Sequence, residues 1–400
     1  MTLGLYISVP FCRTKCSYCN FASDVFSRAA YDQYVARVVE DIEGAFPAAA
    51  GLGCALPETV DSICLGGGTP SILDSNQLIR IFTALRDKFA VSADAEVTVE
   101  CAPATLTPAL IETLLACGVN RVSQGVQSFV DREAQSVGRL HKRATVLEEI
   151  ERLRSAGITN LNIDLIAGLP HQTAASWELS LRETVASGVP HVSVYMLEID
   201  EDSRLGRELI AGGTRYHAHF VPDEDATADL YTQACDTLNA AGIPQYEISN
   251  FARPGWESRH NLKYWTRQPY LGFGVDAHSM LPSRDGANCR AIRFSTPDSL
   301  DAYINRSLGL TTAVSPSAEL EETFFLGLRL NRGLDLEMVR DGFGSERLAA
   351  LQPVIDEAVR EELLLLKEGT NLRLTARGRL LSNEVFARFL REGVAGTSSA

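Results

Sequence analysis

The chain has 400 residues, of which 45% are hydrophobic and 22% charged, an ordinary globular composition with room for two domains. Its formal net charge of −14, with no basic run, disfavours nucleic-acid binding, because such binding rests on neutralising phosphates. No apolar run approaches the length of a membrane helix, and the first residues lack a secretory signal, so we expect a cytoplasmic protein that is not membrane-embedded.

From residue 3 to about residue 250, short β-branched runs alternate with amphipathic helical patterns. The predicted strands are 5–9, 62–65, 96–100, 121–126, 160–166 and 191–196. The clearest predicted helices are 31–42, one that begins near residue 75, and 225–241. Six strand–helix units in strict alternation predict an α/β fold with a parallel sheet over residues 1–250, either open or closed into a partial barrel.

The pattern changes after residue 250. Residues 251–295 are rich in Arg, Gly, Pro and aromatics with little periodicity, and we assign 251–310 to a connecting segment. Helices are then predicted at 319–330, 336–341 and 348–367, with 363–366 as a buried helical stripe, followed by a strand at 371–375 and a helix at 377–390. Helices that end in a β-wing predict a winged-helix-like domain at 311–392, and the small polar residues 393–400 predict a disordered tail.

Three of the nine cysteines lie within eight residues, directly after the first strand. Cys12, Cys16 and Cys19 have the spacing C-x3-C-x2-C, and Arg13 and Lys15 add positive charge beside them. Close-spaced cysteines in a cytosolic chain indicate a metal or catalytic site, and the six scattered ones are more typical of small buried hydrophobes. Three thiolates can hold a [4Fe–4S] cluster and leave one iron open for a small molecule. A zinc loop is the alternative, although zinc usually has four ligands.

Polar residues and glycines follow the other predicted strands. Residues 65–70, Leu-Gly-Gly-Gly-Thr-Pro, end the second strand, where backbone N–H groups can bind a carboxylate or simply form a turn. Glu100, Gln127 and Asp164 lie at or near the carboxyl ends of later strands, where α/β sheets place their sites. A structural ion pair between an arginine and Glu100 or Asp164 is the alternative, because an unpaired buried carboxylate is costly.

The cysteine loop, with Tyr18 just before the last cysteine, resembles the radical S-adenosylmethionine (SAM) superfamily. The resemblance implies a six-fold β/α partial barrel. It also implies one-electron cleavage of S-adenosylmethionine to methionine and a 5′-deoxyadenosyl radical.

A closer resemblance is to the oxygen-independent coproporphyrinogen III oxidase group, which also carries a helical C-terminal domain, so that it covers nearly the whole chain. The matching segments are 6–12 (YISVPFC), 66–70 (GGGTP), 99–103 (VECAP), 121–129 (RVSQGVQSF), 138–139 (GR) and 162–170 (NIDLIAGLP). The residues that the resemblance assigns to the S-adenosylmethionine shell are Tyr6, Tyr18, Gly67, Gly68, Thr69, Glu100, Gln127, Arg139 and Asp164.

Two departures point instead to the sister family of HemW-type heme chaperones. The oxidases have a fourth cysteine where this chain has Phe21. They also carry a sizeable segment before the first strand, whereas the first predicted strand begins here at residue 5. Smaller departures from the usual family pattern are Ser8, Asn20 and Ala167.

Residues 260–265, His-Asn-Leu-Lys-Tyr-Trp, resemble the H-N-x-x-Y-W motif of those chaperones, which the resemblance ties to heme. His260 and Asn261, with the flat Tyr264 and Trp265, are therefore the candidate heme residues, since neutral His can ligate heme iron. The alternative is that these aromatics only pack the loop against the barrel.

Histidines elsewhere in the chain are further candidate ligands. His278 lies in a Gly-rich turn and is a second candidate for heme. His217 and His219 resemble a metal pair, but a surface pair is the better interpretation because no third ligand is apparent.

The leading hypothesis is a heme chaperone that binds heme, a [4Fe–4S] cluster and S-adenosylmethionine and delivers heme to a respiratory membrane protein. We expect it to lack coproporphyrinogen III oxidase activity and to be a monomer or a cluster-dependent dimer. The alternative hypotheses are that oxidase itself, which decarboxylates propionates by radical chemistry, and an interaction protein without a cluster.

Overall fold

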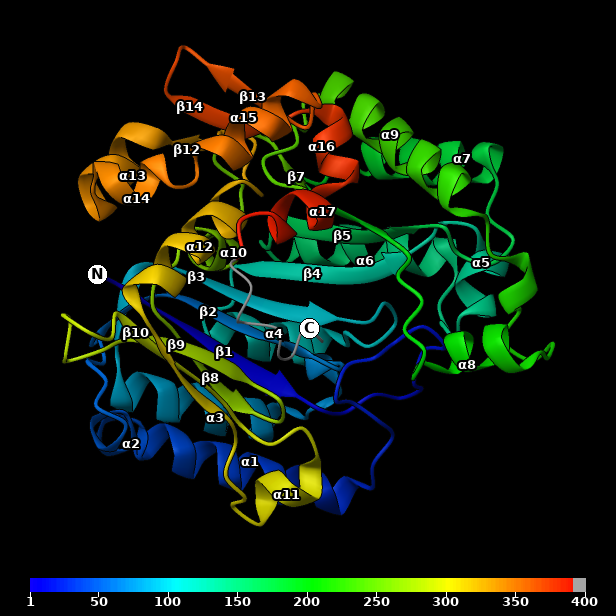
Figure 1. Ribbon diagram of the computed structural model, residues 1–400. Helices are drawn as coiled ribbons and strands as arrows, with labels where there is room; N and C mark the ends of the chain where they lie inside the picture. Colours follow the sequence, from blue (N-terminus) through cyan, green and yellow to red (C-terminus); the bar gives the residue numbers. More distant parts are fainter. Residues whose placement is uncertain (391–400) are drawn as a thin grey trace.

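The computed structural model describes residues 1–390, so the predicted tail at 393–400 lies outside the described part of the chain. Its centre is an 11-stranded sheet with the order β11-β10-β9-β8-β1-β2-β3-β4-β5-β6-β7 (Figure 1). The six central strands are parallel, as predicted. They are β1 (Leu3–Val9), β2 (Thr59–Gly67), β3 (Ala90–Cys101), β4 (Arg121–Gln127), β5 (Asn160–Ala167) and β6 (His191–Met196). Because β1 pairs with β2 and β8 and not with β6, the barrel is open.

Helices cover the outer face of these strands. The main ones are α1 (Arg28–Glu43), α3 (Ser75–Lys88), α4 (Pro108–Ala116), α6 (Arg143–Ser155), α7 (Ala174–Ser187) and α9 (Glu224–Ala240), with the shorter α2 (Ala45–Gly51), α5 (Asp131–Ser136) and α8 (Arg204–Ala211) between them. Leu5, Ile7 and Val9 of β1 are fully buried in one cluster with Tyr34 and Val38 of α1. Burial of each such side chain stabilises the fold by roughly 1.5–3 kcal/mol. The alternate residues of the strands face the barrel interior.

The segment after residue 250 contains regular structure that the sequence pattern did not predict. Its elements are β7 (Asn250–Ala252), α10 (Arg259–Trp265), β8 (Tyr270–Gly274), β9 (His278–Pro282), β10 (Ala291–Ser295), α11 (Leu300–Ile304) and β11 (Thr311–Val314). Strand β8 pairs with β1 in parallel, and β9 to β11 extend the sheet antiparallel. Glycines hide the alternation of β8: a Cβ on Gly272 would lie 2.5 Å from the His278 carbonyl oxygen, so a side chain is excluded there.

The C-terminal region has its own hydrophobic cluster, which includes Phe324, Ile355, Leu372 and Phe389. Its helices are α12 (Pro316–Gly327), α13 (Leu336–Phe343), α14 (Ser345–Ala349), α15 (Gln352–Arg360), α16 (Ala376–Leu380) and α17 (Ser382–Ala387). A three-stranded antiparallel wing accompanies them, in the order β12 (Leu334–Asp335), β14 (Asn371–Leu374) and β13 (Leu364–Lys367). The predicted combination of helices and a β-wing is therefore confirmed.

The helix predicted at 348–367 is wrong in its second half. Helix α15 ends at Arg360, Glu362 takes a left-handed backbone conformation with φ 59°, and the next residues form β13. Leu365 and Leu366 are 39% and 41% exposed, so they do not form a buried stripe. A run of four leucines satisfies both helical and strand periodicity, and pairing with β14 decides between them. The helix predicted at 377–390 is likewise divided, into α16 and α17.

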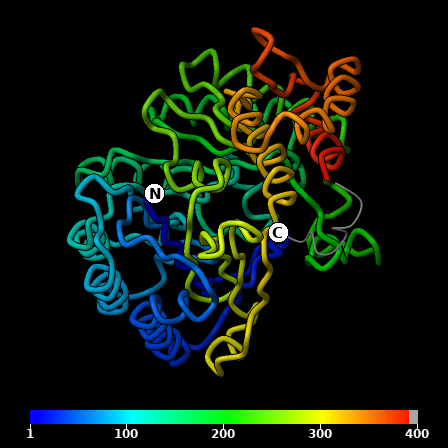
Figure 2. The backbone as a smooth tube through the Cα atoms, turned by 60° about the vertical axis from the view of Figure 1, so that its left-hand side comes forward, coloured from blue at the N-terminus to red at the C-terminus, as the bar shows by residue number. Residues whose placement is uncertain are grey.

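Charged and aromatic contacts join the C-terminal region to the barrel. Figure 2 shows the backbone of this region, in orange, beside green segments of the chain. The fully buried Glu247 lies 3.5 Å from the Arg329 guanidinium, which in turn stacks 4.2 Å from the centre of the Trp265 ring. Arg267, after α10, binds Glu319 and Glu322 of α12 at 2.9 Å each. Within residues 1–390, no helix has both the length and the apolar character to cross a bilayer.

Candidate cofactor site

The three clustered cysteines lie on the loop that follows β1 and leads to α1, and this loop packs against the end of α5. Backbone bonds hold the loop: the Cys19 N–H donates to the Cys16 carbonyl at 3.4 Å, and the Ser17 N–H donates to the Val137 carbonyl at 3.2 Å. All three thiols are free and partly exposed, with Cys12 next to the glycine loop. The structure thus brings the three predicted ligands to one loop that solvent reaches.

Burial dominates the electrostatics of these thiols. It raises the pKa of Cys12 and Cys19, and Cys16 raises both further, while Arg139 lowers the pKa of Cys12. The predicted cations act elsewhere: Lys15 donates to the Phe21 carbonyl at 3.4 Å, and Arg13 donates to a carbonyl at 3.5 Å. A coordinating metal deprotonates thiols outright, so bound iron would offset the raised pKa values.

No three His, Cys, Asp or Glu side chains among residues 1–390 are grouped closely enough to hold a single metal ion. A mononuclear zinc site is therefore disfavoured at the cysteine loop. A cuboidal cluster binds each thiolate through a different iron and accepts sulfurs that lie farther apart. The donor set of three thiols on one loop fits such a cluster.

The glycine loop at the end of β2 lies between the cysteines and Glu100. A Cβ on Gly66 would lie 2.7 Å from the Glu100 carboxylate, and one on Gly68 would lie 3.1 Å from the Cys12 sulfur. Gly67 has φ +95°, a conformation that favours glycine, and its backbone N–H interacts with the Glu100 carboxylate. The Thr69 hydroxyl approaches the Cys12 sulfur at 3.8 Å. The chain can therefore present bare backbone to a ligand here.

Glu100 and Asp164 face each other inside the barrel, and neither forms an ion pair with an arginine or lysine in the described part of the chain. Burial and the nearby Asp164 raise the pKa of Glu100 to about 7. Burial also raises the pKa of Asp164, although hydroxyl and amide donors and the charge of Arg139 oppose the shift. The structure therefore does not support the alternative of a structural ion pair. Two neighbouring carboxyls instead favour a bound cation.

Gln127 and Arg139 converge above Gly125 with unused polar atoms. A Cβ on Gly125 would lie 3.1 Å from the Gln127 amide nitrogen and 3.2 Å from an Arg139 guanidinium nitrogen. Gln127 Oε1 and Arg139 Nε are buried without a partner, and Gln127 has φ +68°, which is strained for a residue with a side chain. Arg139 also donates to the Tyr18 hydroxyl at 3.1 Å. Unpaired buried groups of both kinds indicate a missing polar ligand.

Tyr6 completes the predicted shell from the middle of β1. Burial and the Glu100 carboxylate raise its pKa well above the ordinary value for tyrosine. The nine predicted residues thus come from strands β1 to β5, from the loops after β1 and β2, and from the segment after α5. S-adenosylmethionine carries ammonium, sulfonium and carboxylate groups. The two carboxyls and the unpaired amide oxygen fit its cationic groups, and the unpaired guanidinium N–H and the glycine backbone fit its carboxylate.

Three hydroxyl and amide side chains that the sequence analysis overlooked hold Asp164. Ser123 donates to its carboxylate at 3.0 Å, and Asn162 donates at 2.7 Å and also reaches Ser193 at 3.1 Å. Each lies on the same face of its strand as another polar residue two positions away. That alternation of polar residues is the signal that the sequence offers.

The predicted heme residues lie on α10, which closes the opposite end of the barrel. His260 is 2% exposed, and its ring nitrogens bond the Ser62 hydroxyl at 3.0 Å and the Tyr264 hydroxyl at 2.9 Å. Burial lowers the pKa of His260 to about 3. The backbone N–H of His260 also donates to the Glu96 carboxylate at 3.1 Å. The motif is thus part of the barrel floor.

Tyr264 is the motif residue that bonds the His260 ring, and Asn261 and Trp265 have other partners. Asn261 N–H is bound by the Ser258 hydroxyl that begins α10, and Trp265 turns outward to stack on Arg329. Tyr264 contacts Tyr270 edge-on, with ring centres 4.7 Å apart. The four residues therefore do not line one common surface. His278, the second candidate, is the first residue of β9. Its side chain is exposed and lies 3.7 Å from the Asp276 carboxylate.

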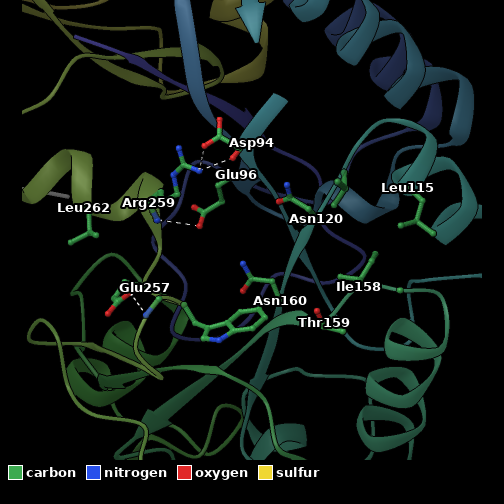
Figure 3. A pocket seen from close by; sticks show the side chains of 14 residues that line it. Asp94, Glu96, Leu115, Asn120, Ile158, Thr159, Asn160, Glu257, Arg259 and Leu262 are labelled. Atoms are coloured by element: carbon green, nitrogen blue, oxygen red, sulfur yellow. Dashed lines mark hydrogen bonds and ion pairs between the residues drawn. The ribbon is translucent and has the colours of Figure 1, made fainter. Parts of the chain in front are cut away.

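A cavity of about 510 Å³ lies at the same amino-terminal end of the strands (Figure 3). Its lining residues include Glu96, Asn120, Asn160, Trp256 and Arg259. Figure 3 shows the Arg259 side chain beside Asp94 and the Arg259 backbone N–H donating to Glu96. None of the predicted cofactor residues lines it. In α/β barrels this end serves stability more than chemistry.

The comparisons with known proteins agree in both halves of the chain. Residues 6–183 match the radical SAM superfamily, and residues 314–381 match the HemN C-terminal domain. Heme chaperone HemW of Bacillus subtilis is 33% identical over 390 residues, which are 97% of this chain and 99% of that protein. Heme chaperone HemW of Lactococcus lactis is 32% identical over 392 residues, 97% of each chain.

The solved structure of coproporphyrinogen III oxidase (HemN) from Escherichia coli, a radical SAM enzyme, has a TM-score of 0.82 to this chain. The match covers 97% of this chain and 90% of that one, at 24% identity. At this identity the likeness shows a shared fold alone.

Proposed function

Because the chain belongs to the heme chaperone HemW family of the radical SAM superfamily, we propose that it binds heme and delivers it to a membrane protein of respiration. The observation that carries this proposal is the likeness to curated heme chaperones along 97% of both chains, which includes the barrel and the C-terminal region. We place the protein in the cytoplasm, with the acceptor of heme as its client.

Three cysteines and the surrounding shell are proposed to hold the cofactors. Cys12, Cys16 and Cys19 would bind three irons of a [4Fe–4S] cluster, and the glycine loop with Gln127 and Arg139 would hold S-adenosylmethionine. When bound, the cluster supplies an electron to S-adenosylmethionine. In this chain Glu100 and Asp164 offset the positive charge of that ligand, and the Tyr18 hydroxyl keeps the Arg139 guanidinium in place.

Phe21 supports a chaperone over an oxidase. It is 61% exposed beside the cysteine loop, so this position offers an apolar ring and no fourth thiol. Robust conversion of coproporphyrinogen III in an anaerobic assay, with reduced cluster and S-adenosylmethionine, would assign the chain to the oxidases instead.

The H-N-x-x-Y-W residues remain the proposed heme ligands, with a structural condition. Both nitrogens of His260 are engaged inside the barrel floor, so ligation of iron by His260 requires α10 to leave that floor. His278 needs no such movement, because its ring is 64% exposed.

The test is a heme titration of the purified full-length chain, followed by the Soret absorbance. We expect a saturable Soret band for the wild type, its loss in His260→Ala if α10 opens, and its loss in His278→Ala if that histidine is the ligand. Thermal unfolding of each variant without heme separates lost binding from lost folding. If the wild type gives no band, heme binding and the proposal are refuted.

A further inference from the structure

A pocket outside the cofactor site joins α5 to the loops that follow β5 and α8. It has a volume of about 300 Å³, and its lining residues are Arg132, Gln135, Ser136, His171, His217 and Phe220. Helix α5 also contacts the cysteine loop, so the pocket lies at the carboxyl end of the barrel strands. Neither the cofactor shell nor the proposed heme motif uses these residues.

Hydrogen bonds hold the side chains of this pocket in fixed positions. An Arg132 guanidinium nitrogen lies 3.2 Å from His171 Nδ1, and His171 Nε2 lies 3.2 Å from His217 Nδ1. Both histidines have left-handed backbones, with φ +69° and +61°, and the His171 N–H donates to the Phe220 carbonyl at 2.9 Å. Strained backbones that are held by a cross-link between two loops often mark functional positions.

The direction of these bonds follows from the chemistry of arginine. Guanidinium has no acceptor, so Arg132 donates to His171 Nδ1 and places the His171 proton on Nε2. That proton is donated to His217 Nδ1, which leaves the His217 proton on Nε2. The chain therefore ends in N–H groups, and no imidazole lone pair remains for a metal.

The charges around the pocket favour an anion. Burial, Arg132, His217 and His219 all lower the pKa of His171, because a further positive charge is unfavourable there. The carboxylate of Glu208, which acts on His219, is occupied by the backbone N–H groups of Tyr216 and Ala218 at 2.8 and 3.1 Å. A ligand carboxylate would therefore meet Arg132 and imidazole donors without a competing acid.

An exposed aromatic ring completes the pocket. Phe220 is 45% exposed, and its ring centre lies 4.1 Å from the ring centres of both His171 and His219. A flat apolar surface beside N–H donors fits a ligand that is planar and carries a carboxylate at its edge.

We propose that this pocket docks the propionate edge of a porphyrin, with the carboxylate on Arg132 and His217 and the macrocycle against Phe220. The identity of the ligand rests on the proposed function. The pocket, however, would contact the propionate and the ring and not the iron. A metal-free porphyrin therefore binds here as heme does.

The test uses the full-length chain and metal-free protoporphyrin IX, with binding followed by porphyrin fluorescence. We expect saturable binding of the diacid and at least tenfold weaker binding of its dimethyl ester, because charge-assisted bonds to the carboxylate are lost. Arg132→Gln and Phe220→Ala should each weaken binding of the diacid about tenfold. Arg347→Gln, which removes an exposed arginine on α14, is the matched control and should bind as the wild type does.

Several results would overturn the assignment. They are equal binding of the diacid and the ester, unchanged binding by Arg132→Gln, or complete displacement by millimolar inorganic phosphate, which would indicate a general anion site. Binding of heme without binding of metal-free porphyrin also overturns it and leaves the proposed function intact. Conversely, porphyrin binding that depends on Arg132 in a chain with no Soret response to heme would refute the proposed function and keep this site.

Discussion

The environment of Glu100 raises the pKa of its carboxyl, and this shift predicts how stability depends on pH. A carboxyl with a pKa of about 7, beside a second buried carboxyl, destabilises the cofactor-free chain whenever it is ionised. The unfolded chain releases this proton near pH 4.5 and the folded chain only near pH 7. The folded state therefore binds more protons in that window, and stability falls as pH rises through it.

We expect Glu100→Gln to stabilise the cofactor-free chain at pH 8 by up to about 3 kcal/mol and to have little effect at pH 4.5. The same change should weaken binding of S-adenosylmethionine to the reconstituted protein at least tenfold. Urea unfolding at the two pH values and a binding titration measure these effects. Glu112→Gln, at an exposed position of α4, is the control, and equal responses of both variants would contradict the burial argument.

Cysteine substitutions test the cluster ligands at the same scale. Cys12→Ser, Cys16→Ser and Cys19→Ser should each lose most of the iron bound after anaerobic reconstitution, because a hydroxyl is a poor ligand for iron–sulfur clusters. Cys289→Ser removes a partly exposed thiol elsewhere and should keep its iron. Iron and sulfide analysis gives the answer, and full iron content in any of the three loop variants would exclude that cysteine as a ligand.

Among the elements, α10 lies in the segment to which the sequence pattern assigns no regular structure. Its motif was interpreted as a surface for heme, and the structure places His260 and Tyr264 in a buried network with Ser62. Residue identity alone cannot distinguish the two, because a neutral histidine serves equally as a metal ligand and as a satisfied core residue. The pairing partner Ser62 is 198 residues away in sequence, and only the tertiary fold reveals it.

His260→Ala should destabilise the heme-free chain by about 2–4 kcal/mol, since it leaves a cavity and unpaired hydroxyl groups. His278→Ala, on the exposed edge, should change stability by less than about 0.5 kcal/mol. Urea denaturation without heme compares them. Equal stability of the two variants would mean that α10 does not hold His260 inside the floor in solution.

The strands illustrate what sequence patterns predict well. Five of the six parallel strands lie within about three residues of their predicted bounds, and β6 matches them, because short β-branched runs between turn signals mark strands. Strand β3 begins at Ala90 and not at residue 96. The carboxyl ends of these strands are the expected location of Glu100, Gln127 and Asp164, whereas the rest of the S-adenosylmethionine shell follows from the family resemblance. Strand β8 escapes prediction because its partner β1 is distant in sequence and its glycines break the alternation. Residues 363–366 fit a helix as well as a strand, because leucine suits both, and pairing with β14 decides between them.

At the scale of the whole molecule, a buried ion pair fixes the C-terminal region to the barrel. Glu247 is fully buried, and burial raises its pKa, while Arg329 lowers it. Removing Arg329 leaves an uncompensated charge, and such losses typically cost about 3–5 kcal/mol. The Trp265 ring would lose its cationic partner at the same time.

Arg329→Met should therefore lower stability by several kcal/mol, and by more at pH 8 than at pH 5. The sign follows because burial raises the pKa of the Glu247 carboxyl and loss of Arg329 raises it further, so that the carboxyl is more often protonated, hence neutral, at the lower pH. Thermal unfolding at both pH values measures the difference. Arg332→Met, at an exposed position nearby, is the control, and a loss independent of pH would show that packing and not charge is responsible.

The partly exposed cysteine loop has a consequence for the life of the protein in air. A cluster bound by thiols that solvent reaches would also be open to dioxygen, and thiols released from it would then be open to oxidation. The apolar ring of Phe21 lies at this entrance and offers no replacement ligand. The cofactor-loaded state is therefore expected to persist only in anoxic surroundings, which makes oxygen tension itself a switch between two forms of the chain.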